Sequence, residues 1–254
     1  RAGARRGVSG GGGARRGTRS ASLARGFPGR AGAVPAAIAS AARRQLEAYP
    51  TLAWIDGLAT GASGVRDAFA VTTEDGSTHT GRRLLFATGV ADEVPPLPGL
   101  AERWGRSVFH CPYCHGYELG GGRIGVVATG PMSVHQAALL PEWGEITFLT
   151  NEKLVLDTAA RADLERRGVA IEEIPVAGLE GHADVRLADG RLLSFAGLFT
   201  ASRAVPATGI AEAMGCALME TPMGVQVRTS DAKETSIPGV YACGDVARVP
   251  HSVS

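Results

Sequence analysis

Alternating strand-like and helix-like segments in the middle of the chain constrain its fold more than any other feature. Residues 123–128 (RIGVVA) form an apolar, strand-like run, residues 131–140 are typical of a helix, and residues 145–149 (EITFL) form a second strand-like run. Another helical segment follows over residues 157–167. Strands that alternate with helices predict a parallel sheet with helices on its faces. We therefore expect an α/β fold.

The composition of the chain fits a globular α/β protein and argues against several classes of partner. Of its 254 residues, 44% are apolar and 20% are charged, which is ordinary for a globular protein. The formal net charge of +1 provides no general attraction to nucleic acid or to an anionic membrane. No apolar run approaches the roughly 20 residues that a membrane helix needs. Four cysteines with one close pair favour a cytoplasmic compartment over a secreted disulfide scaffold.

One short stretch, HCPYCHGYE over residues 110–118, contains two of the four cysteines. Cys111 and Cys114 form a C-x-x-C dithiol, which can close a short disulfide. Pro112 suits the first turn of a helix, and a helix N-terminus there would stabilise a thiolate. His115 can store or donate a proton as the dithiol opens and closes. Redox chemistry is the interpretation that requires least of the surrounding sequence.

Three other interpretations of this stretch stay open. C-x-x-C followed by His115 is the attachment signature of a c-type haem, but that attachment needs export, and we find no export signal. His110, Cys111, Cys114 and His115 are candidate zinc ligands, but they are too contiguous to converge easily on one tetrahedron. A reduced, inert dithiol packed as two small hydrophobic side chains is the third. We expect no metal site.

The first part of the chain has an unusual composition. Residues 1–32 contain eight Arg, ten Gly and no acidic residue. This composition predicts a disordered segment, which we place at residues 1–25. The glycine-rich run from Gly10 to Gly17 misses the G-x-G-x-x-G spacing in every register, and no strand-like run precedes it. We therefore reject it as a nucleotide-binding loop.

Two small-residue turns follow apolar strands at distant points of the sequence. Residues 84–87 run into Ala87-Thr88-Gly89, and residues 239–242 run into Cys243-Gly244-Asp245. Together with C-P-Y-C at the start of the strand–helix–strand pattern, these turns resemble the flavin-dependent thioredoxin reductase family, a branch of the pyridine nucleotide–disulfide oxidoreductases. The resemblance extends from Gly26 to Ser254. It is closest to the branch with C-P-x-C-H-G-Y-E, which includes the dithiol oxidases of disulfide-containing natural products.

The resemblance implies a two-domain FAD/NAD(P)-binding fold, Rossmann-like and of the thioredoxin reductase type. Residues 26–94 and 222–254 would form a discontinuous FAD-binding domain, and residues 95–221 an inserted NAD(P)-type domain that carries the dithiol. The family's glycine loop is missing before residue 26, and its last helix is missing at the other end of the sequence. We therefore expect an incomplete FAD domain in a chain truncated at both ends.

The resemblance also implies roles for single residues. Cys114 would be the thiol nearest the flavin, Cys111 the outer thiol that exchanges with substrate, and His115 the acid/base in place of the reductases' acid. Asp245 would bind the ribityl chain of FAD. The other implied cofactor contacts are Ala87, Thr88, Gly89, Gly244 and His251 for FAD, and Gly130 and Ser133 for a nicotinamide nucleotide.

These roles imply a flavoprotein oxidoreductase that moves electrons between FAD and a disulfide or dithiol. The implied partner is a thioredoxin-like protein or a small-molecule dithiol or disulfide, and the implied assembly is a homodimer. NADPH or NADH is the implied donor, yet residues 128–133 fit G-x-G-x-x-A only loosely, and Thr150-Asn151 lack the basic residues that bind a 2′-phosphate. A dithiol oxidase that uses oxygen without NAD(P)H is therefore one alternative. The alternative of another class is a non-catalytic fragment that cannot hold FAD.

Overall fold

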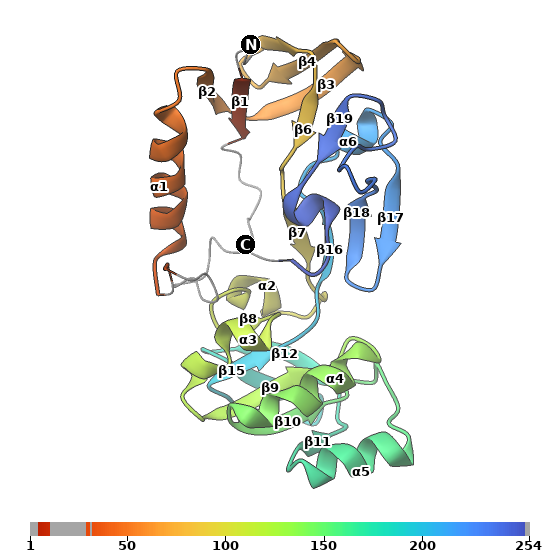
Figure 1. The fold of residues 1–254 in the computed structure, drawn as a ribbon. Helices are drawn as coiled ribbons and strands as arrows, with labels where there is room; N and C mark the ends of the chain where they lie inside the picture. The colour runs from red at the N-terminus through yellow and green to blue at the C-terminus, as the bar shows by residue number, and fades with distance from the viewer. Residues whose placement is uncertain (1–4, 11–28, 31, 252–254) are drawn as a thin grey trace. The chain divides into compact units, whose positions relative to one another are not determined.

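The computed structural model describes residues 5–10, 29–30 and 32–251. Internal contacts divide the chain into two compact units: unit 1 comprises residues 1–93 with 203–254, and unit 2 comprises residues 94–202. Each unit contains both helices and strands (Figure 1), so the α/β class is confirmed. Among the described residues, no helix is both long and apolar enough to cross a membrane.

Unit 2 is built around a parallel five-stranded sheet. The order of its strands is β11-β10-β9-β15-β8, and all neighbouring pairs run parallel. The strands are β8 (Val108–Phe109), β9 (Arg123–Val127), β10 (Glu145–Leu149), β11 (Ala170–Glu172) and β15 (Gly197–Phe199). Counted from β9, four of these strands follow the 3-2-1-4 order of a Rossmann fold, in which ligands bind beyond the carboxyl ends of the strands, and β8 adds a fifth strand beside β15. The strand–helix pattern expected from the sequence is therefore confirmed.

Two helices connect the parallel strands of unit 2. Helix α4 (Met132–Leu139) follows β9, and α5 (Thr158–Arg166) follows β10. Figure 1 shows α4 lying against β9 and β10. The shorter helical elements of the unit are α2 (Leu100–Arg103), α3 (Pro112–His115), η1 (Tyr117–Leu119) and η2 (Leu140–Glu142).

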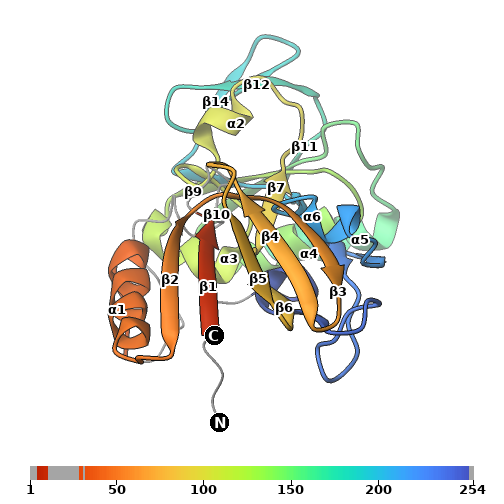
Figure 2. The ribbon, with the colours of Figure 1, turned by 90° about the horizontal axis from the view of Figure 1, so that it is seen from above.

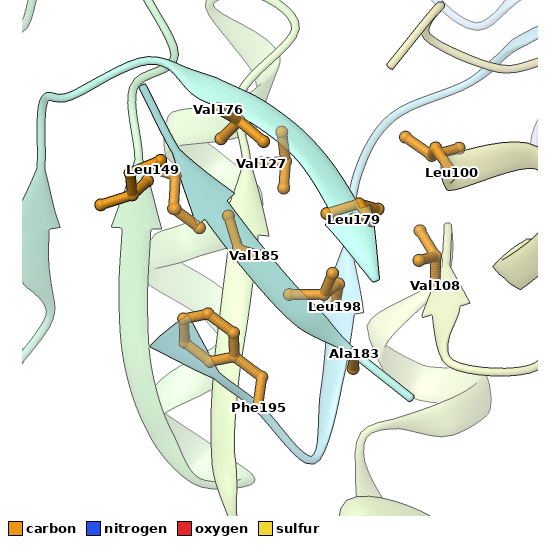
Figure 3. Close-up of a cluster of buried hydrophobic side chains, with 11 residues drawn as sticks. Leu100, Val108, Val127, Leu149, Val176, Leu179, Ala183, Val185, Phe195 and Leu198 are labelled. Atoms are coloured by element: carbon orange, nitrogen blue, oxygen red, sulfur yellow. The ribbon is translucent and has the colours of Figure 1, made fainter. Parts of the chain in front are cut away.

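The parallel sheet buries both of its faces, because successive residues of a strand point to opposite sides. On one face, Val127 and Leu149 pack against an antiparallel sheet inserted between β11 and β15. Figure 3 shows these side chains meeting Val176 and Val185 of that inserted sheet. Its strands are β12 (Val176–Glu180), β13 (Asp184–Leu187) and β14 (Leu192–Ser194).

The opposite face of the parallel sheet packs against α4 and α5. Val126 and Phe148, each one residue before its counterpart on the first face, join Ala137 of α4 and Leu164 of α5 in this second core. Phe109, the last residue of β8, belongs to the same cluster. The chain that leaves β8 therefore starts from the face that α4 covers.

Unit 1 consists of several small sheets. Parallel pairs are formed by β1 with β2 and by β6 with β19 (Figure 2 shows the first pair beside α1). Antiparallel sheets are formed by β3-β4-β5 and, apart from the parallel contact of β16 with β18, by β17-β18-β16-β7. The elements are β1 (Arg5–Gly10), α1 (Pro35–Glu47), β2 (Leu52–Gly57), β3 (Ala59–Val65), β4 (Ala68–Thr73), β5 (Thr78–Gly81), β6 (Leu84–Phe86), β7 (Val90–Glu93), β16 (Arg203–Pro206), α6 (Ile210–Ala213), β17 (Leu218–Thr221), β18 (Gly224–Val227), β19 (Val240–Ala242) and η3 (Gly244–Ala247).

Two expectations about the chain's organisation need correction. Disorder across residues 1–25 is wrong for residues 5–10, because they form β1 and pair with β2. A strand therefore does precede the glycine-rich run, although its spacing still differs from G-x-G-x-x-G. Residues 11–28, which include Gly26 at the expected start of the FAD-binding domain, lie outside the described residues. The second unit boundary falls at residue 203 rather than 222, because β16 pairs with β7 of unit 1.

Candidate active site

The two clustered cysteines lie directly after β8 and are joined by a disulfide. Cys111 is the N-cap of α3, and Pro112 takes the first helical position. The Cα atoms of Cys111 and Cys114 are 5.3 Å apart, within the usual range for a disulfide. Cys114 is exposed, and Cys111 is half-buried. The short disulfide at a helix start, expected from the spacing, is thus formed.

The disulfide bears on the other interpretations of the same stretch. Two sulfur atoms bonded to each other cannot at the same time form thioether bonds to a haem or thiolate bonds to zinc. Within the described residues, no cluster of three or more His, Cys, Asp or Glu side chains is arranged to hold a metal ion. In the structure the two cysteines are therefore in the disulfide form, and their redox role stays a prediction.

His115 stands at the other end of α3, next to Cys114. Its imidazole stacks on the ring of Phe109, with 4.2 Å between the ring centroids and 14° between the planes. Burial lowers the pKa of His115 below its usual value of 6.5, and the charge of Glu118 and the carbonyl of Cys111 oppose this shift only in part. In the described part of the chain, Nδ1 of this ring is buried without a hydrogen-bond partner of normal geometry. Burial therefore favours the neutral form of the His115 imidazole, which follows Cys114 in the sequence.

An aromatic pair lies at α3, the helix of the dithiol. Tyr113, between the two cysteines, is 72% exposed, and its ring meets Trp143 edge-on at 5.5 Å between centroids. Gly116 lies so close to Trp143 that an added Cβ would approach its ring to 2.8 Å. The G of C-H-G-Y-E therefore allows Trp143 to pack against α3, the helix that carries Cys114.

In unit 1, the two small-residue turns expected to contact FAD lie side by side. Strands β6 and β19 run parallel, so their carboxyl ends meet at one edge, where the Cys243 N–H donates to the Phe86 carbonyl at 2.9 Å. Ala87 and Thr88 are exposed at this edge. Gly89 and Gly244 have positive φ angles of 71° and 70°. The structure therefore brings together two motifs that are about 150 residues apart in the sequence.

The geometry of this edge fits a flavin nucleotide. Among the described residues other than its chain neighbours, none has an atom within 4 Å of the position that a Cβ on Gly244 would occupy, so a ligand can approach the backbone there. Asp245 follows in η3 and is half-buried. Its carboxylate is of a kind that accepts hydrogen bonds from sugar hydroxyls. His251 is half-buried at the end of the described residues, and its contact with FAD stays a prediction.

The expected nucleotide loop of unit 2 lies where β9 runs into α4, at the carboxyl edge of the sheet. Ser133 is buried, and its Oγ accepts a hydrogen bond from the Thr129 N–H at 3.0 Å. The Ser133 N–H donates to the Gly130 carbonyl at 3.0 Å, while Gly130 itself has open space around it. The loop thus leaves room for a ligand at Gly130, but the Thr129 N–H is already hydrogen-bonded to Ser133 within the loop.

At the end of β10, where dinucleotide-binding proteins of this fold bind the ribose, a side chain is also hydrogen-bonded within the unit. Asn151 is buried with a positive φ of 52°, and its Oδ1 accepts from the Val176 N–H at 2.8 Å. Glu152 and Lys153 are exposed in the turn that follows. Lys153 supplies a positive charge that was not recognised from the Thr150-Asn151 pair, although it lies only two residues beyond it.

Three supporting residues of the dithiol were not recognised from the sequence: Phe109, Gln136 and Trp143. Phe109 and Trp143 read as ordinary core aromatic residues, and Gln136 as one polar residue on a helix. Gln136 donates to the His110 carbonyl and Trp143 meets the Tyr113 ring, and only the packing of distant segments brings these two residues there. Phe109 is a neighbour in sequence, but its stacking on His115 is a tertiary contact that no local pattern indicates.

A parallel nucleotide-type sheet that carries a disulfide, in a chain with a second edge suited to a flavin, defines the class of dinucleotide-dependent disulfide oxidoreductases. Comparison with known proteins agrees with this class. The family model described as pyridine nucleotide-disulphide oxidoreductase matches residues 40–254. The chain belongs to this family, whose members are FAD-dependent enzymes that include the thioredoxin reductases.

Individual relatives support the assignment. The chain is 33% identical to the thioredoxin reductase tcpT of Claviceps purpurea over 251 residues, covering 89% of this chain and 76% of the relative. It is 31% identical to the thioredoxin reductase sirT of Leptosphaeria maculans over 209 residues, covering 75% of this chain and 63% of that relative. The crystal structure of an oxidoreductase from Agrobacterium tumefaciens matches with 47% identity and a TM-score of 0.91, covering 96% of this chain and 82% of that one.

Proposed function

We propose that this chain transfers electrons between FAD and a disulfide or dithiol substrate through Cys111 and Cys114. The observation that carries the proposal is the closed Cys111–Cys114 disulfide directly after a strand of the nucleotide-type sheet. Membership of a family of flavin-dependent disulfide oxidoreductases supports it.

In the reductive direction, the thiolate of Cys111 attacks the substrate disulfide, forms a mixed disulfide and releases the first substrate thiol. Cys114 then attacks the Cys111 sulfur, closes the intramolecular disulfide and releases the second thiol. Two electrons and two protons pass from the dithiol to the substrate. FAD, when bound, supplies or accepts the electron pair that interconverts disulfide and dithiol. Which cysteine faces the flavin follows from the family resemblance and stays a prediction.

His115 is proposed as the acid/base of this exchange. Its neutral imidazole lies beside Cys114 in sequence, and burial lowers its pKa. A neutral ring can accept the proton of a thiol and return it to the leaving sulfur. FAD is proposed to bind at the turns Ala87–Gly89 and Gly244–Asp245, with His251 nearby.

An absorption spectrum of the purified protein tests the proposal. We expect a flavin band, or its appearance when FAD is added, and bleaching of that band by a dithiol under argon. Cys111→Ser and Cys114→Ser should each abolish bleaching while they leave FAD binding intact. A protein that gains no flavin band on addition of FAD would support the non-catalytic fragment instead.

A dithiol oxidase that uses oxygen is the second candidate. The hydrogen bond from Thr129 to Ser133 favours it, because this amide is then not free for the pyrophosphate of a nicotinamide nucleotide. Stopped-flow mixing of the flavin-loaded protein with NADPH and with NADH under argon separates the two. Bleaching by either nucleotide supports the reductase, and bleaching by a dithiol alone, followed by recovery in air, supports the oxidase.

The substrate is proposed to be a thioredoxin-like protein or a small dithiol or disulfide, in a cytoplasmic compartment where close cysteine pairs are usually catalytic. The relatives named thioredoxin reductase support the first option. A homodimer is proposed from the same resemblance, and sedimentation velocity of the flavin-loaded protein tests it.

A further inference from the structure

The stretch that carries the dithiol receives little support from the sheet. Strand β8 is only two residues long and lies at the edge, where β15 is its one neighbouring strand in this sheet and Val108 adds an isolated bridge to Trp104. The last ladder bond of this region is donated by the Thr200 N–H to the Phe109 carbonyl at 3.0 Å. Beyond Phe109 the chain leaves the sheet, so the position of the cysteines depends on other contacts.

One such contact comes from helix α4. The Nε2 group of Gln136 donates a hydrogen bond of 2.7 Å to the carbonyl oxygen of His110, the residue directly before Cys111. The next residue of the helix, Ala137, is fully buried against the parallel sheet. The bond therefore ties the peptide group next to Cys111 to a helix that the core holds in place.

The other end of the same side chain shows that core stability alone does not favour an amide here. Gln136 Oε1 is buried and, within the described residues, has no hydrogen-bond partner. A buried acceptor without a donor destabilises a fold relative to an apolar side chain of similar size. The favourable contact that the amide makes is the bond to His110.

We propose that Gln136 is a positioning residue that holds Cys111 and Cys114 at disulfide distance and thereby favours the oxidised pair. The inference rests on the proposed redox function of the two cysteines. In the disulfide, the covalent bond already restricts the stretch. In the dithiol, the stretch regains conformational freedom, and the hydrogen bond from Gln136 to the His110 carbonyl removes part of that freedom. The bond to His110 therefore stabilises the disulfide more than the dithiol, because in the dithiol part of its gain is lost in ordering the stretch.

A glutathione redox titration measures this effect without flavin or turnover. Two glutathione thiols and the Cys111–Cys114 disulfide give one glutathione disulfide and the dithiol, so two electrons and two protons pass to the protein. Alkylation of free thiols, followed by mass analysis of the peptide that contains both cysteines, gives the reduced fraction.

Two variants remove the bond in different ways. Gln136→Met keeps the side-chain volume and loses the donor, whereas Gln136→Asn keeps the amide but is one methylene too short to reach His110. Both should raise the equilibrium constant for reduction about threefold to tenfold, which corresponds to a rise in reduction potential of up to about 30 mV. His135→Asn, an exposed position on the same helix, is the matched control and should titrate like the wild type.

The outcomes separate this inference from the proposed function. If the wild-type pair titrates and both Gln136 variants titrate with the same constant, the inference is wrong, even if the variants melt at lower temperature. If Gln136 had only a structural role, its substitution would destabilise the disulfide and the dithiol forms alike. A wild-type disulfide that glutathione cannot reduce at any ratio contradicts the proposed function and this inference together.

Discussion

His115 has the chemistry that a proton carrier beside a dithiol needs. Burial against Phe109 favours the uncharged ring, and the carbonyl of Cys111 and the charge of Glu118 only partly offset this preference. An imidazole that is neutral at pH 7 acts as a base, whereas an imidazolium would already carry the proton it has to accept. The environment of the ring therefore suits the direction in which a thiol becomes a thiolate.

The first prediction concerns the titration of His115. In the folded protein its pKa should lie below 6.5, as measured by proton NMR with His115→Gln to assign the signal. Because the unfolded chain then binds this proton first as the pH falls, folding should lose stability below about pH 6.5 and regain it above. Urea unfolding at a series of pH values should show a smaller loss in His115→Gln. A pKa at or above 6.5 would contradict the burial argument.

A second prediction concerns Gly116. Its backbone is helical, with φ −59° and ψ −41°, so alanine would ordinarily be preferred here. An added Cβ would lie 2.8 Å from Trp143 and 2.9 Å from the Pro112 carbonyl oxygen. Gly116→Ala should therefore destabilise unit 2 by about 1–3 kcal/mol, measured by urea unfolding. Gly130→Ala, in open space within the same unit, is the control and should change stability much less.

Among the elements, those with strong local patterns could be predicted from the sequence. The apolar runs at 123–128 and 145–149 became β9 and β10, and the segment 157–167 contains α5. Each carries its signal in its own residues, as a continuous apolar run or as a capped helix. Strand β8 could not be predicted, because two residues have no periodicity and its place depends on β15, almost 90 residues later.

Strand β1 and the unit boundary show a different limit. Pairing of β1 with β2 uses backbone N–H and C=O groups, which arginine and glycine provide as well as valine does. A composition rule that counts apolar side chains therefore misses it. Similarly, β16 is part of unit 1 because it is hydrogen-bonded to β7, more than 100 residues earlier in the chain. No local sequence pattern at residue 203 indicates that pairing.

The third prediction belongs to helix α5. Asp157 caps its N-terminus, with its carboxylate accepting a hydrogen bond from the Ala160 N–H at 2.7 Å. Asp157→Ala should destabilise unit 2 by about 0.5–2 kcal/mol, whereas Asp157→Asn, which keeps an accepting oxygen, should lose only a fraction of that. Chemical denaturation of the three proteins checks both values. Equal losses in the two variants would mean that the cap bond is not what stabilises the helix.

At the scale of the whole molecule, the sequence indicated the reacting groups better than it indicated the residues that position them. Cys111, Cys114 and the turn at Gly244 stand out because each lies in a short motif. Phe109 and Gln136 do not, because their contribution depends on how β8 and α4 pack on one sheet. Motifs reveal reacting groups, while positioning residues come from tertiary contacts that one sequence does not display.

The fourth prediction uses the division into two units. Calorimetry should show two unfolding transitions, and Gly116→Ala should identify that of unit 2 by lowering it. FAD at about 100 times its Kd should stabilise unit 1 by about 2.7 kcal/mol. Asp245→Ala should remove most of this shift, and Asp231→Ala, at an exposed position of the same unit, should keep it. If FAD raises neither transition, the edge formed by β6 and β19 is not a flavin site.

The edge position of β8 also has a consequence for the order in which the protein is made. The ribosome releases Val108 and Phe109 long before the residues of β15 with which they pair, 198 and 199. Until then, the strand that leads to the cysteines has no place in the sheet. We therefore expect nascent chains to keep this dithiol open to cellular thiols and alkylating reagents. Protection should begin only once residues 198 and 199 have left the ribosomal tunnel, because the pairing closes a long loop.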